Sequence, residues 1–190
     1  MEEKIEKELK WAVLGTGIIA NEMAQALEKM GKNLYAVANR TYGKAVEFAE
    51  KYGVQKVYDK IEDMFTDKET DITYITTPHN THIKFMIQAL KNGKHVLCEK
   101  SITLNSEELE EAVKIAKEKN LILGEAMTIF NMPLYTELSE IVNSGKLGDV
   151  KMIQVNFGSY KEYDMSNRFF NRNLAGGALL DIGAVSYTHL

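Results

Sequence analysis

Short apolar runs alternate along this chain with stretches in which apolar residues recur every three or four positions. Compact apolar runs predict buried strands, and recurrence at helical spacing predicts amphipathic helices. Parallel strands need a crossover connection, which a helix usually supplies, so the alternation predicts an α/β fold with a doubly wound parallel sheet. The predicted strands cover residues 11–14, 34–38, 57–58, 71–78, 95–98 and 121–123, and the predicted helices cover residues 19–30, 41–52, 61–65, 83–90 and 105–116.

The pattern changes near Pro133. Helical spacing runs to Gly145, and apolar and polar residues then alternate over residues 153–157, which predicts a strand with one buried face, as in an antiparallel sheet. The glycine pair at 176–177 precedes another predicted helix. We therefore expect a parallel-sheet domain over residues 1–126 and the start of an α+β antiparallel-sheet domain over residues 127–190.

Composition and charge then narrow the class of protein. Hydrophobic residues make up 45% of the chain and charged residues 26%, which is ordinary for a globular protein. The net charge of -4 offers no basic patch for nucleic acid, and no run approaches the roughly 18 apolar residues of a membrane helix. The single cysteine, Cys98, and the charged segment Met1–Glu8 fit a cytoplasmic protein without a signal peptide. We expect a small-molecule partner, and a buried strand position for Cys98.

The first predicted strand runs into a glycine turn, Gly15-Thr16-Gly17-Ile18-Ile19-Ala20, which opens a predicted helix. Gly15 allows the tight turn, Gly17 lets a pyrophosphate approach the backbone, and Ala20 lets the helix pack closely on the strand. The helix N-terminus adds unpaired N–H groups and the positive end of a dipole. The turn therefore predicts dinucleotide binding by a Rossmann domain, with a glycine-rich turn that binds nothing as the alternative.

The end of the second predicted strand bears on which dinucleotide binds. NAD-preferring domains usually place an acidic residue there, about 20 residues beyond the glycines, to bind the ribose hydroxyls. This chain has Asn39 followed by Arg40, and an amide beside a guanidinium suits a 2′-phosphate better. We expect NADP in preference to NAD, with a solvated loop charge as the alternative for Arg40.

Four stretches together identify a family resemblance. In this order and spacing they resemble the Gfo/Idh/MocA oxidoreductases. The resemblance implies NAD(P)-dependent hydride transfer at an alcohol or carbonyl carbon of a sugar, cyclitol or dihydrodiol, and an open antiparallel sheet in the second domain through which the full-length protein forms a homo-oligomer. The four stretches are residues 15–20, 77–82, 93–100 and 176–183.

The resemblance also implies roles for individual residues. Lys100 corresponds to the catalytic lysine of a Glu-Lys-Pro signature, which here reads Glu99-Lys100-Ser101, without the proline. Asp181 corresponds to a second catalytic residue. The cofactor is expected to lie beside Gly15, Thr16, Gly17, Ile18, Ile19, Asn39, Arg40, Thr77, Pro78, His82, Glu99 and Lys100.

Other histidines are expected to have no such role. We interpret His79 as a loop residue that is at least as well explained by facing solvent. The spacing of His79, His82 and His95 matches no common zinc pattern, so we expect no metal site.

The end of the chain departs from the family pattern. Four positions after Asp181 the family has a histidine or tyrosine, but this chain has Val185, and Tyr187 and His189 are out of register. Residues 185–190 also correspond to one reading frame of a widely used transposase sequencing adapter, so we hypothesise a non-native tail on a C-terminally truncated protein. An NADP(H)-binding module without turnover is therefore the alternative function, and a redox sensor that docks a protein has no supporting motif.

Overall fold

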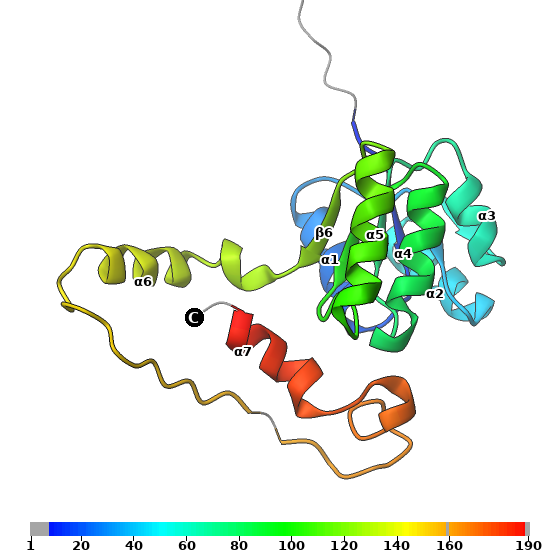
Figure 1. The fold of residues 1–190 in the computed structure, drawn as a ribbon. Coiled ribbons are helices and arrows are strands. Elements are labelled where there is room, and N and C mark those ends of the chain that lie inside the picture. The colour runs from blue at the N-terminus through cyan, green and yellow to red at the C-terminus, as the bar shows by residue number, and fades with distance from the viewer. Residues whose placement is uncertain (1–7, 159, 189–190) are drawn as a thin grey trace, which may run out of the picture.

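The computed structural model describes residues 8–158 and 160–188 and is built on one six-stranded sheet (Figure 1). The strand order is β3-β2-β1-β4-β5-β6, and every neighbouring pair is parallel. This confirms the predicted doubly wound parallel sheet. The strands are β1 (Trp11–Leu14), β2 (Ala36–Ala38), β3 (Lys56–Tyr58), β4 (Ile72–Ile75), β5 (His95–Glu99) and β6 (Leu123–Ala126).

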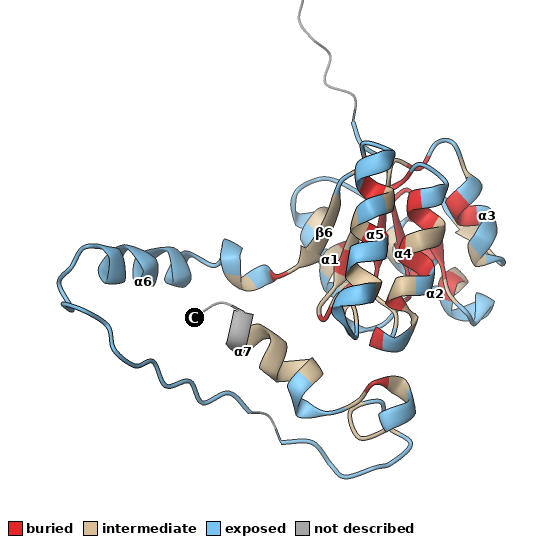
Figure 2. Ribbon diagram, in the orientation of Figure 1, coloured by how far each residue is buried: buried red, intermediate tan, exposed pale blue. Residues whose placement is uncertain are grey.

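Helices cover both faces of the sheet and bury its apolar strands. Helices α1 and α2 pack on one face, and α3, α4 and α5 pack on the other (Figure 2). Within β1, Val13 faces the first layer, whereas Ala12 and Leu14 face the second, which is why the strand is apolar at successive positions. The helices are α1 (Ile18–Lys29), α2 (Tyr42–Tyr52), α3 (Ile61–Thr66), α4 (His82–Lys91) and α5 (Ser106–Glu118).

The sixth strand lies two residues later than the sequence predicts. The apolar run 121–123 suggested its position, but Leu121 instead closes the preceding helix with a backbone hydrogen bond to Ala116 and packs on the core. The ladder with β5 begins at Leu123 and continues through Gly124 and Glu125. Hydrogen bonding to the neighbouring strand, rather than side-chain hydrophobicity, therefore sets the bounds of β6.

Beyond β6 the chain leaves the sheet and exposes its apolar side chains (Figure 2). Helix α6 (Pro133–Asn143) forms where helical spacing predicts it, yet Leu134, Leu138 and Ile141 are exposed. The strand predicted over residues 153–157 is wrong, because the described chain shows no strand there and these residues are exposed. A strand needs a neighbour for its backbone hydrogen bonds, and none of the described residues provides one.

The last described segment contains a helix that begins after Gly177, as predicted. It consists of a π-helical stretch at Leu179–Gly183 and helix α7 (Ala184–Thr188). The charged segment before Glu8 and the last two residues of the hypothesised tail lie outside the described residues. Among the helices described, none has the length and hydropathy needed to cross a membrane.

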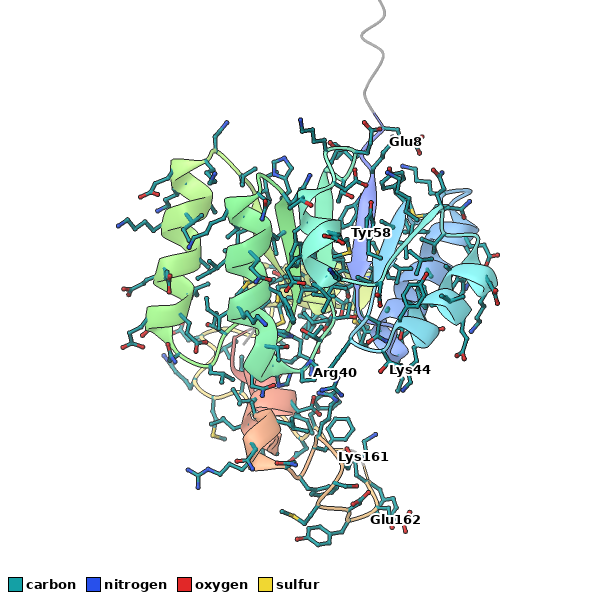
Figure 3. The ribbon with its side chains drawn as sticks, turned by 90° about the vertical axis from the view of Figure 1, so that its right-hand side faces the viewer. Glu8, Arg40, Lys44, Tyr58, Lys161 and Glu162 are labelled. Carbon is teal, nitrogen blue, oxygen red and sulfur yellow. The ribbon has the colours of Figure 1, made fainter. Side chains whose placement is uncertain are left out.

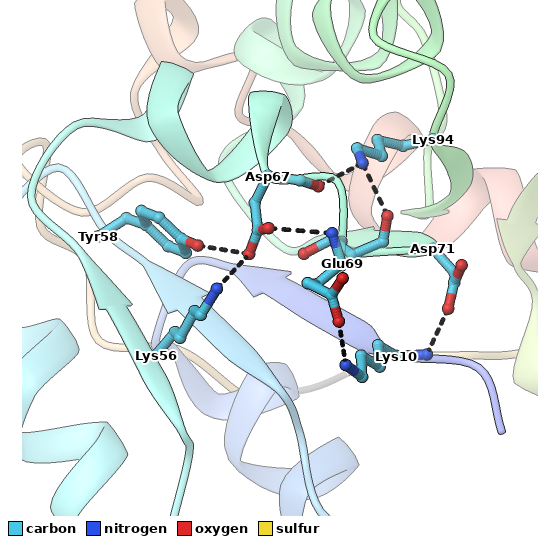
Figure 4. Close-up of polar contacts among 8 residues, drawn as sticks. Lys10, Lys56, Tyr58, Asp67, Glu69, Asp71 and Lys94 are labelled. Carbon is cyan, nitrogen blue, oxygen red and sulfur yellow. Dashed lines mark hydrogen bonds and ion pairs between the residues drawn. The ribbon is translucent and has the colours of Figure 1, made fainter.

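A network of charged groups joins the loops at the amino ends of the strands (Figure 4). The Asp67 carboxylate accepts hydrogen bonds from the Tyr58 hydroxyl at 2.5 Å, from Lys56 at 3.1 Å and from the backbone N–H of Glu69 at 3.0 Å. Burial alone would raise the pKa of the Asp67 carboxyl, but these hydrogen bonds outweigh burial and lower the pKa from 3.8 to about 2. Lys94 is buried beside them and donates to the backbone carbonyls of Asp67 and Thr70.

The Asp67 network predicts a loss of stability in acid. Because folding lowers the pKa of this carboxyl, its contribution is fully present above pH 3.8 and is lost as the pH falls from about 4 to about 2. We expect Asp67→Asn to reduce the free energy of unfolding at pH 7 by about 1–2 kcal/mol. Urea titrations at pH 7 and pH 3 should show the difference between variant and native chain shrinking in acid.

The matched control is Asp59→Asn, which removes an exposed carboxylate close to the same loops. We expect it to change the free energy of unfolding by less than about 0.5 kcal/mol. Equal effects of the two substitutions at pH 7 would contradict a special role for Asp67.

Candidate functional site

The turn between β1 and α1 requires glycine at its first position. Gly15 has a φ of +105°, which is unfavourable for residues with a side chain, and its N–H donates to the carbonyl of Ala38 at 2.9 Å. A Cβ atom at Gly15 would lie 2.5 Å from Oγ1 of Thr76, at the end of β4. The turn is therefore packed against the strand on which the sheet reverses its order. Such a switch point is where doubly wound sheets bind ligands.

The second glycine leaves backbone open at the N-terminus of α1. Gly17 is the N-cap residue and makes no side-chain capping bond, and a Cβ atom built on it would meet nothing within 4 Å. Ile18 begins the helix and is 76% exposed, whereas Ile19 packs on the core and Ala20 is fully buried. The first N–H groups of α1 have no partner within the helix, so this end can accept an anion.

The loop after β2 is attached to the glycine turn by one amide side chain. Asn39 donates to Oγ1 of Thr16 at 2.5 Å, and its amide oxygen accepts from the N–H of Thr41 at 3.4 Å. Arg40 is exposed, and Figure 3 shows Arg40 and Lys44 at the end of the strands opposite to Glu8. The Asn39 side chain is thus occupied by hydrogen bonds to the loop and the glycine turn, whereas the Arg40 side chain is exposed.

Two buried histidines belong to the connection between β4 and α4: His79 lies in the loop, and His82 is the first residue of α4. His82 is fully buried, and its ring nitrogens lie 2.8 Å from the carbonyl oxygen of Thr77 and 2.9 Å from that of Ser101. The expectation that His79 faces solvent is wrong, since it is only 5% exposed and its Nε2 atom lies 2.9 Å from the carbonyl oxygen of Lys100. Burial lowers the pKa of both histidines, although the neighbouring carbonyls oppose it. Both rings therefore support the backbone that carries Lys100.

The burial of His79 could have been suspected from its position rather than its residue type. It begins a short 3-10 turn, His79–Thr81, directly after Pro78. A turn at the carboxyl end of a parallel strand faces the crevice of the sheet, whereas a typical surface loop does not. Thr77 and Pro78 also follow the carboxyl end of β4, and Thr77 accepts a hydrogen bond from Thr81 at 2.8 Å.

The two residues expected to be catalytic lie in contact although 81 positions separate them. Nζ of Lys100, directly after β5, lies 3.1 Å from Oδ1 of Asp181 and also donates to the Asp181 backbone carbonyl. The two side chains are 25% and 23% exposed, so the pair is open to a small molecule. A guanidinium nitrogen of Arg168 lies 3.9 Å from the same carboxylate oxygen, so the Asp181 charge has two cationic neighbours.

Glu99, the last residue of β5, accepts a hydrogen bond from the buried hydroxyl of Tyr74 at 2.5 Å. Burial raises the pKa of the Glu99 carboxyl, and the Tyr74 and Lys100 hydrogen bonds oppose this shift. Cys98 is fully buried, as its strand position predicts, and burial raises the pKa of its thiol. Within the described residues, no three His, Cys, Asp or Glu side chains are grouped to hold a metal ion.

The site lies in a chain that matches two family models. Residues 9–127 match the Gfo/Idh/MocA model described as an oxidoreductase family with an NAD-binding Rossmann fold. The chain belongs to the Gfo/Idh/MocA family. Residues 135–185 match the Gfo/Idh/MocA C-terminal domain, and this range includes most of α6 and the segment that carries Asp181.

Curated relatives are similar over nearly all of this Gfo/Idh/MocA chain. Trans-1,2-dihydrobenzene-1,2-diol dehydrogenase from Xenopus laevis is 35% identical over 177 residues, and the human protein of that name is 34% identical over 178 residues. Each match covers 92% of this chain and 53% of the relative. The chain therefore spans about half the length of these relatives.

Solved structures resemble both the sheet and the later segment that carries Asp181. The myo-inositol 2-dehydrogenase from Lactobacillus plantarum superimposes with a TM-score of 0.69 at 26% identity, covering 76% of this chain and 43% of its own. A 3-ketoreductase from Actinomadura kijaniata, solved with NADP and TDP-benzene, gives a TM-score of 0.82 at 25% identity and covers 93% of this chain and 55% of its own. The Gfo/Idh/MocA assignment thus extends beyond the Rossmann sheet.

Proposed function

We propose that this protein is an NADP(H)-dependent oxidoreductase that interconverts an alcohol and a carbonyl group on a small polyhydroxylated substrate. The observation that carries the proposal is the contact between Lys100 and Asp181 at the carboxyl end of β5. A partly exposed ammonium group paired with a carboxylate, close to the switch point of a Rossmann sheet, suits proton transfer to or from a substrate oxygen.

The glycine turn fits a nicotinamide dinucleotide. Gly17 offers an open backbone, and α1 has an N-terminus without a side-chain cap, which suits a pyrophosphate. Thr77, Pro78 and Glu99 lie at the carboxyl ends of the neighbouring strands, beside the position expected for the rest of the cofactor. When bound, the nicotinamide would supply the hydride acceptor or donor.

Arg40 supports NADP in preference to NAD. Its guanidinium is exposed next to the turn, and the neighbouring Asn39 provides no carboxylate that would repel a 2′-phosphate. The 3-ketoreductase from Actinomadura kijaniata, solved with NADP, is a relative of comparable fold.

The chemistry assigned to this chain is proton transfer and substrate orientation. The Lys100 ammonium would hold the reacting oxygen and give a proton to a carbonyl oxygen in reduction, and the neutral amine form of the same side chain would take the hydroxyl proton in oxidation. Asp181 orients Lys100 through the 3.1 Å contact and offers its second oxygen to a substrate hydroxyl. The buried His79 and His82, which contact the carbonyls of Lys100 and Ser101, hold this backbone in place during both steps.

The named relatives support a substrate class. They are a dihydrodiol dehydrogenase, a myo-inositol 2-dehydrogenase and a 3-ketoreductase. The first two are named for substrates with vicinal hydroxyl groups, and we propose a substrate with such a pair for this chain. We further propose that the full-length protein forms a homo-oligomer through its second domain, as the family resemblance implies.

The test is to measure cofactor binding and turnover with the same preparation. We expect saturable NADPH binding, seen as enhanced nicotinamide fluorescence, that is at least about tenfold tighter than NADH binding. Oxidation of a dihydrodiol, an inositol or a sugar should then generate NADPH from NADP. NADPH binding without turnover on the whole panel would instead favour a cofactor-binding module, and tighter NADH binding would contradict the cofactor assignment.

A further inference from the structure

Besides the Lys100–Asp181 pair, three contacts among the described residues join the segment that carries Asp181 to the Rossmann domain. Figure 1 shows the chain leaving the sheet after β6 and returning in its orange and red part. Asn80 donates to the carbonyl of Asn173 at 3.1 Å, and the His79 ring contacts the backbone of Ala175. The third contact is a hydrogen bond from Oγ of Ser101 to the carbonyl of Leu180 at 2.8 Å.

These contacts hold different parts of residues 172–184, which we call the returning segment. The first two hold the short turn Arg172–Leu174 and the residue that follows it. The third reaches the residue directly before Asp181, within the π-helical stretch Leu179–Gly183. Asp181 itself is tied to the sheet by Lys100. Among the described residues, the Ser101 bond is therefore the contact with the Rossmann domain nearest to Asp181 that does not use the Lys100 ammonium.

Ser101 is buried, and its backbone also supports the site. It is 7% exposed, it follows Lys100 directly, and its own carbonyl oxygen lies 2.9 Å from Nδ1 of His82. Proline, which the family signature has at this position, carries no hydroxyl and could not donate to Leu180. Ser101 thus makes a hydrogen bond between the end of β5 and the returning segment, and a proline at this position could not make it.

We propose that Ser101 is a positioning residue whose hydroxyl, bonded to the carbonyl of Leu180, sets Asp181 against Lys100. The proposal rests on the proposed function in giving Lys100 and Asp181 the catalytic roles. The geometric part stands apart from it: removal of the hydroxyl should loosen residues 179–184 while the contacts at Asn173 and Ala175 keep residues 172–176 docked.

Hydrogen exchange of the whole chain, without cofactor, tests the geometric part. In Ser101→Ala we expect amides in residues 179–184 to exchange about 5- to 10-fold faster, since one buried hydrogen bond is lost. Residues 172–176 should exchange at the native rate. Ser101→Thr keeps a hydroxyl and should restore slow exchange. Unchanged exchange at 179–184 in Ser101→Ala would overturn the proposal whether or not the chain turns over substrate.

A matched control removes another hydroxyl of the same loop. Oγ1 of Thr103 donates to the carbonyl of Asn105 at 2.9 Å and does not reach the returning segment, so Thr103→Val should leave residues 179–184 unchanged. If Ser101→Ala fails to fold, Ser101→Cys, whose thiol is a weak donor, takes its place in the same measurement. Faster exchange at 179–184 in Thr103→Val as well would overturn the assignment to Ser101.

The catalytic part is tested with whichever substrate the turnover panel identifies. We expect Ser101→Ala to lower kcat about tenfold with the KM for NADP within about twofold, and Ser101→Thr to recover most of kcat. Equal kcat in Ser101→Ala and the native chain would overturn the catalytic part. Failure of the proposed function would appear separately, as absence of turnover in the native chain with the exchange difference intact.

Discussion

Replacing Lys100 by methionine is expected to lower kcat at least about a thousandfold while leaving the Kd for NADPH within about threefold. Methionine is unbranched and nearly as long as lysine but has no proton to transfer. The fold should survive, because Arg168 lies 3.9 Å from the Asp181 carboxylate and leaves a cation beside it. Steady-state oxidation of the active substrate and fluorescence titration with NADPH measure the two quantities on one preparation.

The control for this substitution is Lys91→Met, at the exposed end of α4. It makes the same chemical change far from Asp181, so we expect native kcat and native Kd. A Lys100→Met variant with full turnover would remove Lys100 from the mechanism. A variant that lost NADPH binding to the same extent as turnover would make Lys100 a binding residue instead.

Replacing Arg40 by serine is expected to weaken NADPH binding about 10- to 100-fold and to change NADH binding by less than about threefold. One or two charge-assisted hydrogen bonds to a phosphate account for a loss of this size. Arg40 is the better choice for substitution because its side chain is exposed, whereas Asn39 holds the loop through Thr16 and Thr41. Titration of each variant with both nucleotides gives the ratio directly.

Two further variants sharpen this test. Lys32→Ser removes an exposed charge from the turn after α1 and should leave both affinities unchanged, apart from a small effect of net charge. Asn39→Asp introduces the acidic residue typical of NAD-preferring domains and should shift preference toward NADH. If Arg40→Ser weakens NADPH and NADH equally, the guanidinium does not recognise the 2′-phosphate.

The glycine turn shows how much of the fold could be read locally. The positive φ of Gly15 and the open backbone of Gly17 are properties of a short segment, and the spacing of the motif encodes them. The capping bond of α5 is also local, because Asn105 accepts from the N–H of Glu108 three residues on. Elements set by such short-range geometry were predicted close to their observed bounds.

Elements that depend on a neighbour in space were predicted less well. The bounds of β6 follow its ladder with β5, and the alternating residues 153–157 have no partner among the described strands and stay extended and exposed. The burial of His79 likewise depends on the returning segment, since its ring lies between the backbones of Lys100 and Ala175. Periodicity reports which side of a segment is apolar, and says nothing of what covers it.

The sequence by itself determined the alternation of strands and helices that makes a parallel sheet, the glycine turn and the residue types available for chemistry, because hydrophobic period and turn geometry act over a few residues. Only the tertiary structure decided that Lys100 and Asp181 touch, that the rings of His79 and His82 contact the backbone of Lys100 and Ser101, and that Ser101 bonds to Leu180. These contacts join residues 19 to 81 positions apart, and chain packing brings them together.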